Sequence, residues 1–219
     1  PEEKYVALPD PAAKRRHLIL GLATLKQLSA KKFFPPEYGK LKPEEIKVFL
    51  GKELLGLEYQ PLFPVAKLSS ETSHRVYAAG FVTMKEGTGV VHTAVMYGED
   101  DYQLGKKVGL PTFHTVDESG KFIAAAGEGL GGQFVKDPKT EEKIIDSLKR
   151  SSLLFKEELY EHEYPHCWRC ETPVLYYARN AWWVKMTAVK AELVKNNQKV
   201  NWIPEYIKDG RFGEFLREV

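Results

Sequence analysis

Two residues that could carry acid–base or polar chemistry lie in one glycine-rich stretch of this sequence. The segment GTGVVHTAVMYGEDD contains His92 and Asp101, which are nine residues apart. The run GVVHTAV predicts a short strand on which His92 and Ala94 face the same side, and Gly98 predicts a turn into a helix. Such a corner can bring an imidazole and a carboxylate to one cavity mouth, where they could position water or bind a cationic amine.

The same residues also allow a purely structural interpretation. Asp100 or Asp101 could be the N-cap of the helix that the sequence predicts from 101 to 109, because a carboxylate satisfies free N–H groups there. His92 would then be a half-buried strand histidine. The spacing alone favours this structural interpretation, and only geometry can decide between the two.

A glycine motif and a cysteine pair are the other patterns with chemical meaning. Gly127–Gly132 reads GEGLGG, but QFVKDP follows where a dinucleotide site needs a helix, so we expect a flexible loop. HCWRC places Cys167 and Cys170 as one half of a zinc site, and the chain has no other cysteine. Either the second half lies outside the chain, which is favoured, or both thiols stay free of metal, or two histidines complete the site: His162 and His166.

The elements around these residues follow from hydrophobic periodicity and from turn residues. Helices are expected at 11–30, 43–51, 100–109, 139–151, 187–197 and 203–218. Short strands are expected within 52–96, 111–126 and 153–164. The length fits one domain with an appendage, which we divide into 1–160 and 161–219.

Composition narrows the class of protein. The 219 residues are 43% hydrophobic and 28% charged with a net charge of +2, so no strongly basic body indicates a nucleic-acid-binding protein. No apolar run reaches the roughly 18 residues of a membrane span, and the start PEEKYVALPD does not resemble a signal peptide. With only two cysteines, we expect a soluble, reduced, cytoplasmic protein without membrane contact.

Four blocks of sequence closely resemble the isoleucyl-tRNA synthetase family, in the family's order. They are LLGLEYQPLFP (54–64), GTGVVHTAVMYGEDDYQLGKKVGLP (87–111), YPHCWRCETPVLYYARNAWWVK (164–185) and VNWIPEYIKDGRFGEFL (200–216). The related valyl and leucyl enzymes lack a histidine at the position of His92 and have HD where this chain has GED. The resemblance is therefore specific, and it is to the family's editing domain, the connective peptide.

The resemblance implies an α+β fold: a β-barrel editing domain decorated with helices, followed by a mainly helical or irregular C-terminal connector. It implies hydrolysis of valine wrongly attached to isoleucine tRNA. His92 and Asp101 would be the catalytic residues, with Asp101 binding the substrate's amine. The residues Gly89, Ala94, Tyr97 and Gly98 would line the substrate pocket.

The resemblance also implies cofactors and partners. Editing needs no cofactor, zinc is possible at Cys167 and Cys170 in the intact enzyme, and ATP and magnesium belong only to the catalytic domain. The expected partners are the acceptor end of isoleucine tRNA and the remainder of the synthetase chain, in a monomer.

The chemistry suits these residue types. A synthetic pocket for isoleucine rejects valine poorly, because one missing methylene is worth only about 1–3 kcal/mol. A second, smaller pocket can destroy the error, with Asp101 holding the α-ammonium and His92 limiting the side-chain space. We expect direct attack by water, assisted by His92, by the free ribose hydroxyl of the substrate, or by both.

The chain departs from the family pattern at several points. Val95 stands where the family usually has proline. A threonine-rich strand and a first cysteine knuckle, which the family has upstream, are absent, and so are HIGH-like and KMSKS-like sequences. We therefore expect a fragment of a synthetase. Without the threonine-rich wall, the alternative is a non-catalytic module that binds the tRNA acceptor end.

Overall fold

The computed structural model describes residues 1–10, 16–85, 87–159 and 161–218. The chain consists of two compact units, Pro1–Ala178 and Arg179–Val219. The boundary expected near residue 160 from composition falls inside the first unit. Within the described ranges, no helix has the length and apolar character needed to cross a membrane.

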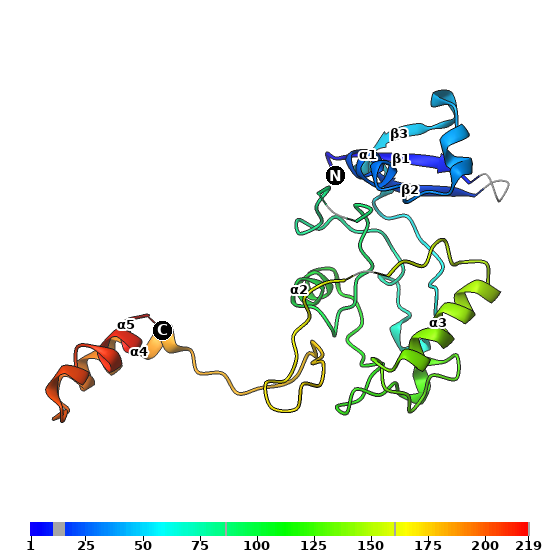
Figure 1. The fold of residues 1–219 in the computed structure, drawn as a ribbon. Helices are drawn as coiled ribbons and strands as arrows, with labels where there is room; N and C mark the ends of the chain where they lie inside the picture. Colours follow the sequence, from blue (N-terminus) through cyan, green and yellow to red (C-terminus); the bar gives the residue numbers. More distant parts are fainter. Residues whose placement is uncertain (11–15, 86, 160, 219) are drawn as a thin grey trace. The chain divides into compact units, whose positions relative to one another are not determined.

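The first unit begins with a small antiparallel sheet, in the order β2-β1-β3 (Figure 1). Its strands are β1 (Lys4–Pro9), β2 (His17–Gly21) and β3 (Lys47–Leu50). Alternate residues of β1, Val6 and Leu8, are buried, as expected of a strand with one face on a core. The sheet is therefore a one-sided layer that needs a helix to cover it.

Helix α1 (Leu22–Ala30) supplies that cover. Three buried residues, Val6, Leu8 and Leu20, form the centre of this core. The partly buried side chains around them are Leu18, Leu22, Leu25, Leu28, Phe34, Tyr38, Leu41 and Ile46. The residues of this core all lie within the first fifty of the chain.

The helix predicted over 11–30 is only partly right. Residues 11–15 lie outside the described part of the chain, residues 17–21 form β2, and the helix begins at Leu22. Leu18 and Leu20 pair with Leu8 and Val6 of β1, so their spacing of two belongs to a strand. A leucine-rich run that serves both spacings is ambiguous until its partner strand is known.

The helix predicted over 43–51 is wrong for most of its length. Only one 3-10 turn, η2 (Pro43–Glu45), forms at the proline, and the chain then enters β3 and a second 3-10 helix, η3 (Gly51–Leu54). Val48 lies opposite Val6 of β1. Pairing with the free edge of β1 satisfies the backbone of this short segment, which outweighs its weak helical pattern.

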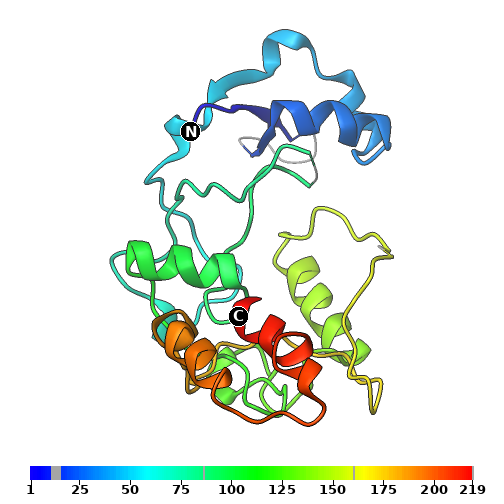
Figure 2. The ribbon, with the colours of Figure 1, turned by 90° about the vertical axis from the view of Figure 1, so that its left-hand side faces the viewer.

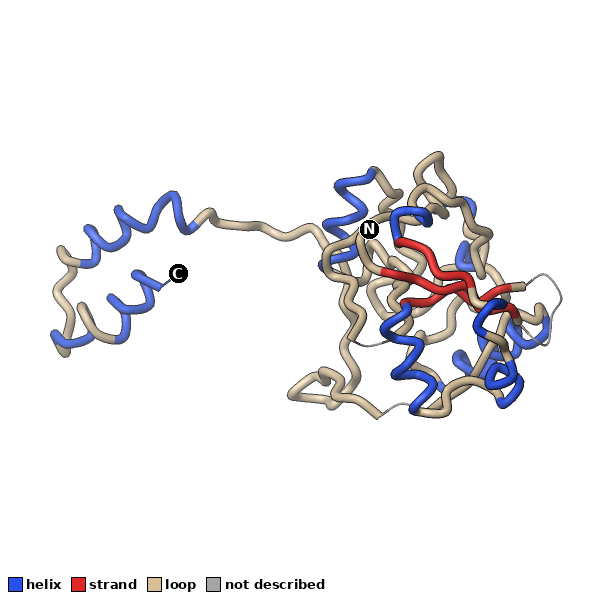
Figure 3. Tube along the Cα trace, turned by 90° about the horizontal axis from the view of Figure 1, so that it is seen from above, coloured by secondary structure: helices blue, strands red, loops and turns tan. Residues whose placement is uncertain are grey.

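The structure has mixed helices and strands, but the closed barrel is not confirmed. The three strands form an open sheet, and the described residues contain no barrel. The segments predicted as strands within 52–96, 111–126 and 153–164 are mostly loops (Figures 2 and 3). Outside the sheet, the described residues of unit 1 form isolated β-bridges: Glu58–Arg75, Val116–Phe122, Lys121–Phe134 and His166–Pro173.

Residues 117–121 form the turn between the two partners of the Val116–Phe122 bridge. The carboxylate of Asp117 accepts hydrogen bonds from the backbone N–H groups of Ser119 (2.9 Å) and Lys121 (3.0 Å). Short polar side chains of this kind offer the backbone an alternative to a strand ladder. The bond from the Lys121 amide, and next the bond from the Ser119 hydroxyl (2.7 Å), hold the pKa of Asp117 below its usual range.

Helices with clear start and stop signals are confirmed. α2 (Glu99–Val108) ends at Gly109, whose φ of 77° is left-handed. α3 (Pro138–Arg150) begins after Asp137, whose side chain accepts from the backbone N–H of Lys139. No helix starts directly after the Gly127–Gly132 loop, so a dinucleotide-binding corner is absent there. The other 3-10 helices of unit 1 are η1 (Pro36–Lys40), η4 (Ala66–Leu68) and η5 (Ala124–Ala126).

The second unit is a helix pair, α4 (Met186–Asn197) and α5 (Arg211–Glu218), with the 3-10 turn η6 (Glu205–Ile207) between them. The predicted helix at 187–197 is confirmed, but the one at 203–218 is interrupted. Asn197 is buried, donates to the carbonyl of Lys208 (2.7 Å) and accepts from the indole N–H of Trp202 (2.9 Å). These bonds satisfy the buried amide and hold the connecting loop against α4.

Helix α2 packs against the segment that precedes it through a glycine. Gly105 is buried, and a methyl group there would come within 2.8 Å of Val95 Cγ1. Val95 is the residue that stands where the family pattern has proline. Its branched side chain therefore fills the space that Gly105 leaves free.

We predict that Gly105→Ala destabilises the protein by about 1–3 kcal/mol, because the added methyl overpacks this contact. In a helix without this contact, the same change would stabilise by about 0.5–1 kcal/mol. Urea unfolding of the wild type, Gly105→Ala and the double variant Gly105→Ala/Val95→Ala measures the effect. Removing the valine methyls should restore part of the lost stability, and an unchanged unfolding midpoint in Gly105→Ala would contradict the packing.

Candidate functional site

Asp101 lies in the first turn of α2, and its side chain points back along the chain. Gly98 is the N-cap residue of α2 and is extended, with no side-chain cap hydrogen bond. Neither Asp100 nor Asp101 is therefore the N-cap, and the capping interpretation is wrong. Instead Asp101 Oδ2 accepts a hydrogen bond from the backbone N–H of Ala94 at 3.1 Å. The carboxylate is only half-buried, so it remains open to a ligand.

This hydrogen bond closes a compact turn. The N–H of Tyr97 donates to the carbonyl of Ala94 at 2.9 Å, which makes residues 94–97 a β-turn. Gly98 has no room for a side chain, since a methyl group there would lie 2.8 Å from Asp101 Oδ2. Four of the predicted site residues thus come together, namely Ala94, Tyr97, Gly98 and Asp101.

The first turn of α2 contains three acidic residues, Glu99, Asp100 and Asp101. Their negative charges interact favourably with the positive end of the helix dipole. Only Asp101 of these turns back to the 94–98 turn. The turn therefore presents one fixed carboxylate, with backbone groups beside it, to the solvent. That arrangement can bind a cationic amine by a charge-assisted hydrogen bond.

His92 does not contact Asp101. Its side chain is exposed, and its ring lies edge-on to that of Tyr59, with 6.3 Å between the ring centroids. Within the described residues no hydrogen bond or ion pair joins His92 to Asp101. The strand predicted for GVVHTAV does not form either, because residues 90–94 belong to no strand or helix.

Gly89 lies away from the turn and contacts the N-terminal sheet. It is buried with a φ of 75°, and its carbonyl accepts from the hydroxyl of Tyr5 at 2.9 Å. The preceding carbonyl, of Thr88, accepts from the N–H of Gly21 at 2.8 Å. The GTG segment thus fastens the start of the candidate site to the corner between β2 and α1.

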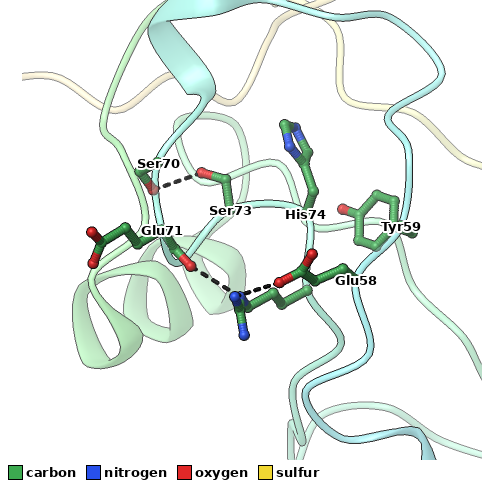
Figure 4. A pocket seen from close by; sticks show the side chains of 7 residues that line it. Glu58, Tyr59, Ser70, Glu71, Ser73 and His74 are labelled. Atoms are coloured by element: carbon green, nitrogen blue, oxygen red, sulfur yellow. Dashed lines mark hydrogen bonds and ion pairs between the residues drawn. The ribbon is translucent and has the colours of Figure 1, made fainter.

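A polar pocket of about 290 Å³ lies beside Tyr59 (Figure 4). Arg75 crosses it, donating to Glu58 Oε1 at 2.5 Å and to the carbonyl of Glu71 at 2.9 Å. The remaining lining residues are Tyr59, Ser70, Ser73 and His74. Burial raises the pKa of Tyr59.

Sequence reasoning missed this pocket. The pocket lies between residues 58–59 and residues 70–75. The opposite charges of Glu58 and Arg75 are the signal in the sequence that could have predicted this contact. Tyr59 is edge-on to His74 as well as to His92, with 5.8 Å between the Tyr59 and His74 centroids. The ring of Tyr59 therefore links the pocket to the predicted site.

Cys167 and Cys170 lie in a tight loop. The N–H of Cys167 donates to the carbonyl of Thr172 at 2.9 Å, and the N–H of Glu171 donates to the carbonyl of Cys167 at 2.8 Å. Cys170 Sγ lies 3.3 Å from the hydroxyl of Thr172. That hydroxyl, with the Thr172 backbone and Cys167, lowers the pKa of Cys170.

The two thiols do not by themselves fit a closed zinc site. His162 and His166 both direct Nδ1 to backbone carbonyls, of Glu163 (3.0 Å) and Tyr164 (2.8 Å). Among the residues that the structure describes, no group of three or more potential ligands could hold a metal ion. Since tetrahedral zinc needs four ligands, this loop can supply only half of them.

We predict that Cys170 is alkylated by iodoacetamide at a lower pH than an ordinary thiol, because the thiolate is the reacting form. In Thr172→Val the hydroxyl that stabilises the thiolate is lost, so the midpoint of the pH profile should move upward. Mass spectrometry of the cysteine peptide measures both profiles, with Thr187→Val as a control at an exposed threonine. Identical midpoints with and without the Thr172 hydroxyl would contradict the assignment.

Comparison with known proteins places these features in a family. The sequence profile described as tRNA synthetases class I (I, L, M and V) matches residues 22–219. The isoleucine--tRNA ligase of Clostridium acetobutylicum is 44% identical over 203 residues, which cover 93% of this chain and 18% of the relative. The isoleucine--tRNA ligase of Clostridium tetani is 47% identical over 176 residues, which cover 80% of this chain and 17% of the relative.

A third relative is similar to the same extent. The isoleucine--tRNA ligase of Picrophilus torridus is 43% identical over 175 residues, which cover 79% of this chain and 16% of the relative. The chain thus spans less than a fifth of the length of these relatives. With the profile matched from α1 to the last residue, the chain belongs to the class I tRNA synthetases, in the isoleucyl-tRNA synthetase family.

Proposed function

We propose that this chain is the editing portion of an isoleucyl-tRNA synthetase, and that it hydrolyses valine esterified to isoleucine tRNA. One observation carries the proposal, the position of the Asp101 carboxylate against the 94–98 turn. Oδ2 is held by the N–H of Ala94, while Oδ1 has no partner among the described residues. A carboxylate fixed by one oxygen and open at the other suits the α-ammonium of an aminoacyl group.

The reaction is ester hydrolysis. A water oxygen attacks the carbonyl carbon of the aminoacyl group, the bond to the ribose oxygen breaks, and that oxygen takes up a proton. Asp101 binds the ammonium and so fixes the carbonyl beside the turn. His92, which is exposed, or the free hydroxyl of the terminal ribose accepts the proton of the attacking water.

His92 also limits the size of the amino-acid side chain in this proposal. The edge-on ring of Tyr59 supports the imidazole from one side. Two rings in this arrangement attract each other and resist displacement. A valine side chain fits against such a wall, and the additional methylene of isoleucine does not.

The complete protein, we propose, ligates isoleucine to its tRNA with ATP and magnesium in a domain outside this chain. The names of the relatives, isoleucine--tRNA ligases, support that role. The partner in this proposal is the acceptor end of isoleucine tRNA. One observation favours a second candidate, a non-catalytic module that binds the acceptor end. His92 and Asp101 are not in contact, and the described residues form no barrel around them.

We predict that Asp101→Asn lowers kcat/KM for hydrolysis of valyl-tRNA(Ile) by the complete protein about a hundredfold, or about 3 kcal/mol of transition-state binding. Asparagine keeps an acceptor for the Ala94 amide and loses the charge, so the turn is preserved. The measurement is release of labelled valine from the charged tRNA.

Asp100→Asn is the matched control, because it removes the same charge from the same helix turn at an exposed side chain. It should leave hydrolysis within about twofold of the wild type. Equal rates for the wild type and Asp101→Asn would overturn the amine-binding role. A wild type that binds the acceptor end without hydrolysis would favour the binding module.

We predict that His92→Ala allows the complete protein to hydrolyse correctly charged isoleucyl-tRNA, because the space limit is removed. Deacylation of valyl-tRNA(Ile) and isoleucyl-tRNA(Ile) is measured side by side, and the ratio should shift toward isoleucine. If His92 serves only as a base, both rates fall and the ratio stays constant. His74→Ala is the control, since His74 contacts the same Tyr59 ring from the polar pocket.

A further inference from the structure

Three rings pack together behind the 94–98 turn, and we call Tyr97, His114 and Tyr177 the aromatic cluster. The rings of His114 and Tyr177 are stacked, with 4.1 Å between their centroids and 11° between their planes. Tyr97 lies edge-on to both, at 5.8 Å from His114 and 6.0 Å from Tyr177. Parts of the chain far apart in sequence thus meet at the side chain of one candidate site residue.

The hydroxyl of Tyr97 is directed to the backbone of residues 115 and 116. It accepts hydrogen bonds from two successive backbone N–H groups, of Thr115 at 2.8 Å and Val116 at 3.0 Å. The hydroxyl of Tyr177 donates to the carbonyl of Val116 at 3.1 Å. The hydroxyls of Tyr97 and Tyr177 are therefore both bonded to the backbone of Val116.

The chain beside Tyr177 adds a third anchor. The N–H of Ala178 donates to the carbonyl of Met96 at 2.8 Å, within the turn itself. The turn is thus held by Asp101 at Ala94, by Ala178 at Met96 and by the cluster at Tyr97. A turn held at three points has little freedom to shift.

His114 contributes to this arrangement through its ring face. Its Nδ1 is buried without a hydrogen-bond partner among the described residues. A buried nitrogen without a partner costs stability, so hydrogen bonding at Nδ1 does not account for the histidine. The ring contacts of His114 with Tyr177 and Tyr97 account for a ring at this position.

We propose that His114 and Tyr177 are positioning residues, which hold Tyr97 and through it set the 94–98 turn against Asp101. This inference rests on the proposed editing function. The substrate's ammonium and carbonyl must meet Asp101 and the turn in one geometry, and small displacements of such groups reduce rates strongly. Among the described residues, no hydrogen bond or ring contact joins His114 or Tyr177 to Asp101.

The test compares two substitutions at one position in the complete protein. His114→Ala removes the ring, whereas His114→Phe keeps a ring and removes the unpartnered nitrogen. We expect kcat for valyl-tRNA(Ile) hydrolysis to fall roughly tenfold in His114→Ala with KM nearly unchanged, and to stay near wild type in His114→Phe. Tyr177→Ala should resemble His114→Ala, and Tyr176→Ala, at an exposed neighbouring tyrosine, is its control.

Hydrogen–deuterium exchange of peptides that contain Thr115 and Val116 gives a readout that does not depend on activity. Their amides should exchange faster in His114→Ala and at the wild-type rate in His114→Phe. Faster exchange with an unchanged kcat would show a merely structural contact and would overturn the positioning role. Unchanged exchange of the Thr115 and Val116 amides in His114→Ala would also overturn the positioning role.

A wild type without hydrolytic activity would contradict the proposed function instead. If exchange still differed between His114→Ala and His114→Phe, the anchoring of Tyr97 by the aromatic cluster would stand without the editing reaction.

Discussion

The hydrogen bond from the Ala94 amide to the Asp101 carboxylate is the contact on which the candidate site depends. It turns the chain before α2 back onto the first turn of the helix, and it orients the one carboxylate that the turn presents. Gly98 makes this possible, because a side chain there would meet that carboxylate. A group that both closes a turn and offers a free oxygen is fixed before a ligand arrives, so binding costs less ordering.

The rest of unit 1 holds the two ends of this segment. On one side, the carbonyls of Thr88 and Gly89 are bonded to Gly21 and Tyr5, which belong to the corner and sheet of the N-terminal core. On the other side, Val95 packs on Gly105, and Tyr97 is fastened to residues 115 and 116. The site is therefore carried by loops, and the loops owe their order to hydrogen bonds from distant parts of the chain.

The resemblance to isoleucyl-tRNA synthetases and the local helix signals were readable from the sequence. α2 and α3 begin and end where acids, proline, lysines and glycine indicate, because caps act within a few residues. The strands were less predictable. Leu18 and Leu20 fit a helix until β1 supplies partners, and the runs in 52–96 fit strands although few of them find a partner. Pairing is a non-local property, and periodicity alone does not report it.

The sequence by itself determined the family, the residue types at the candidate site and the close spacing of Cys167 and Cys170, since each follows from identity or spacing along the chain. The tertiary structure decided which of these residues meet. It joined Asp101 to Ala94 and Gly89 to Tyr5, and brought Tyr59 to His92 and His114 to Tyr97. Contacts between residues so far apart depend on packing and loop closure, and short-range patterns do not encode them.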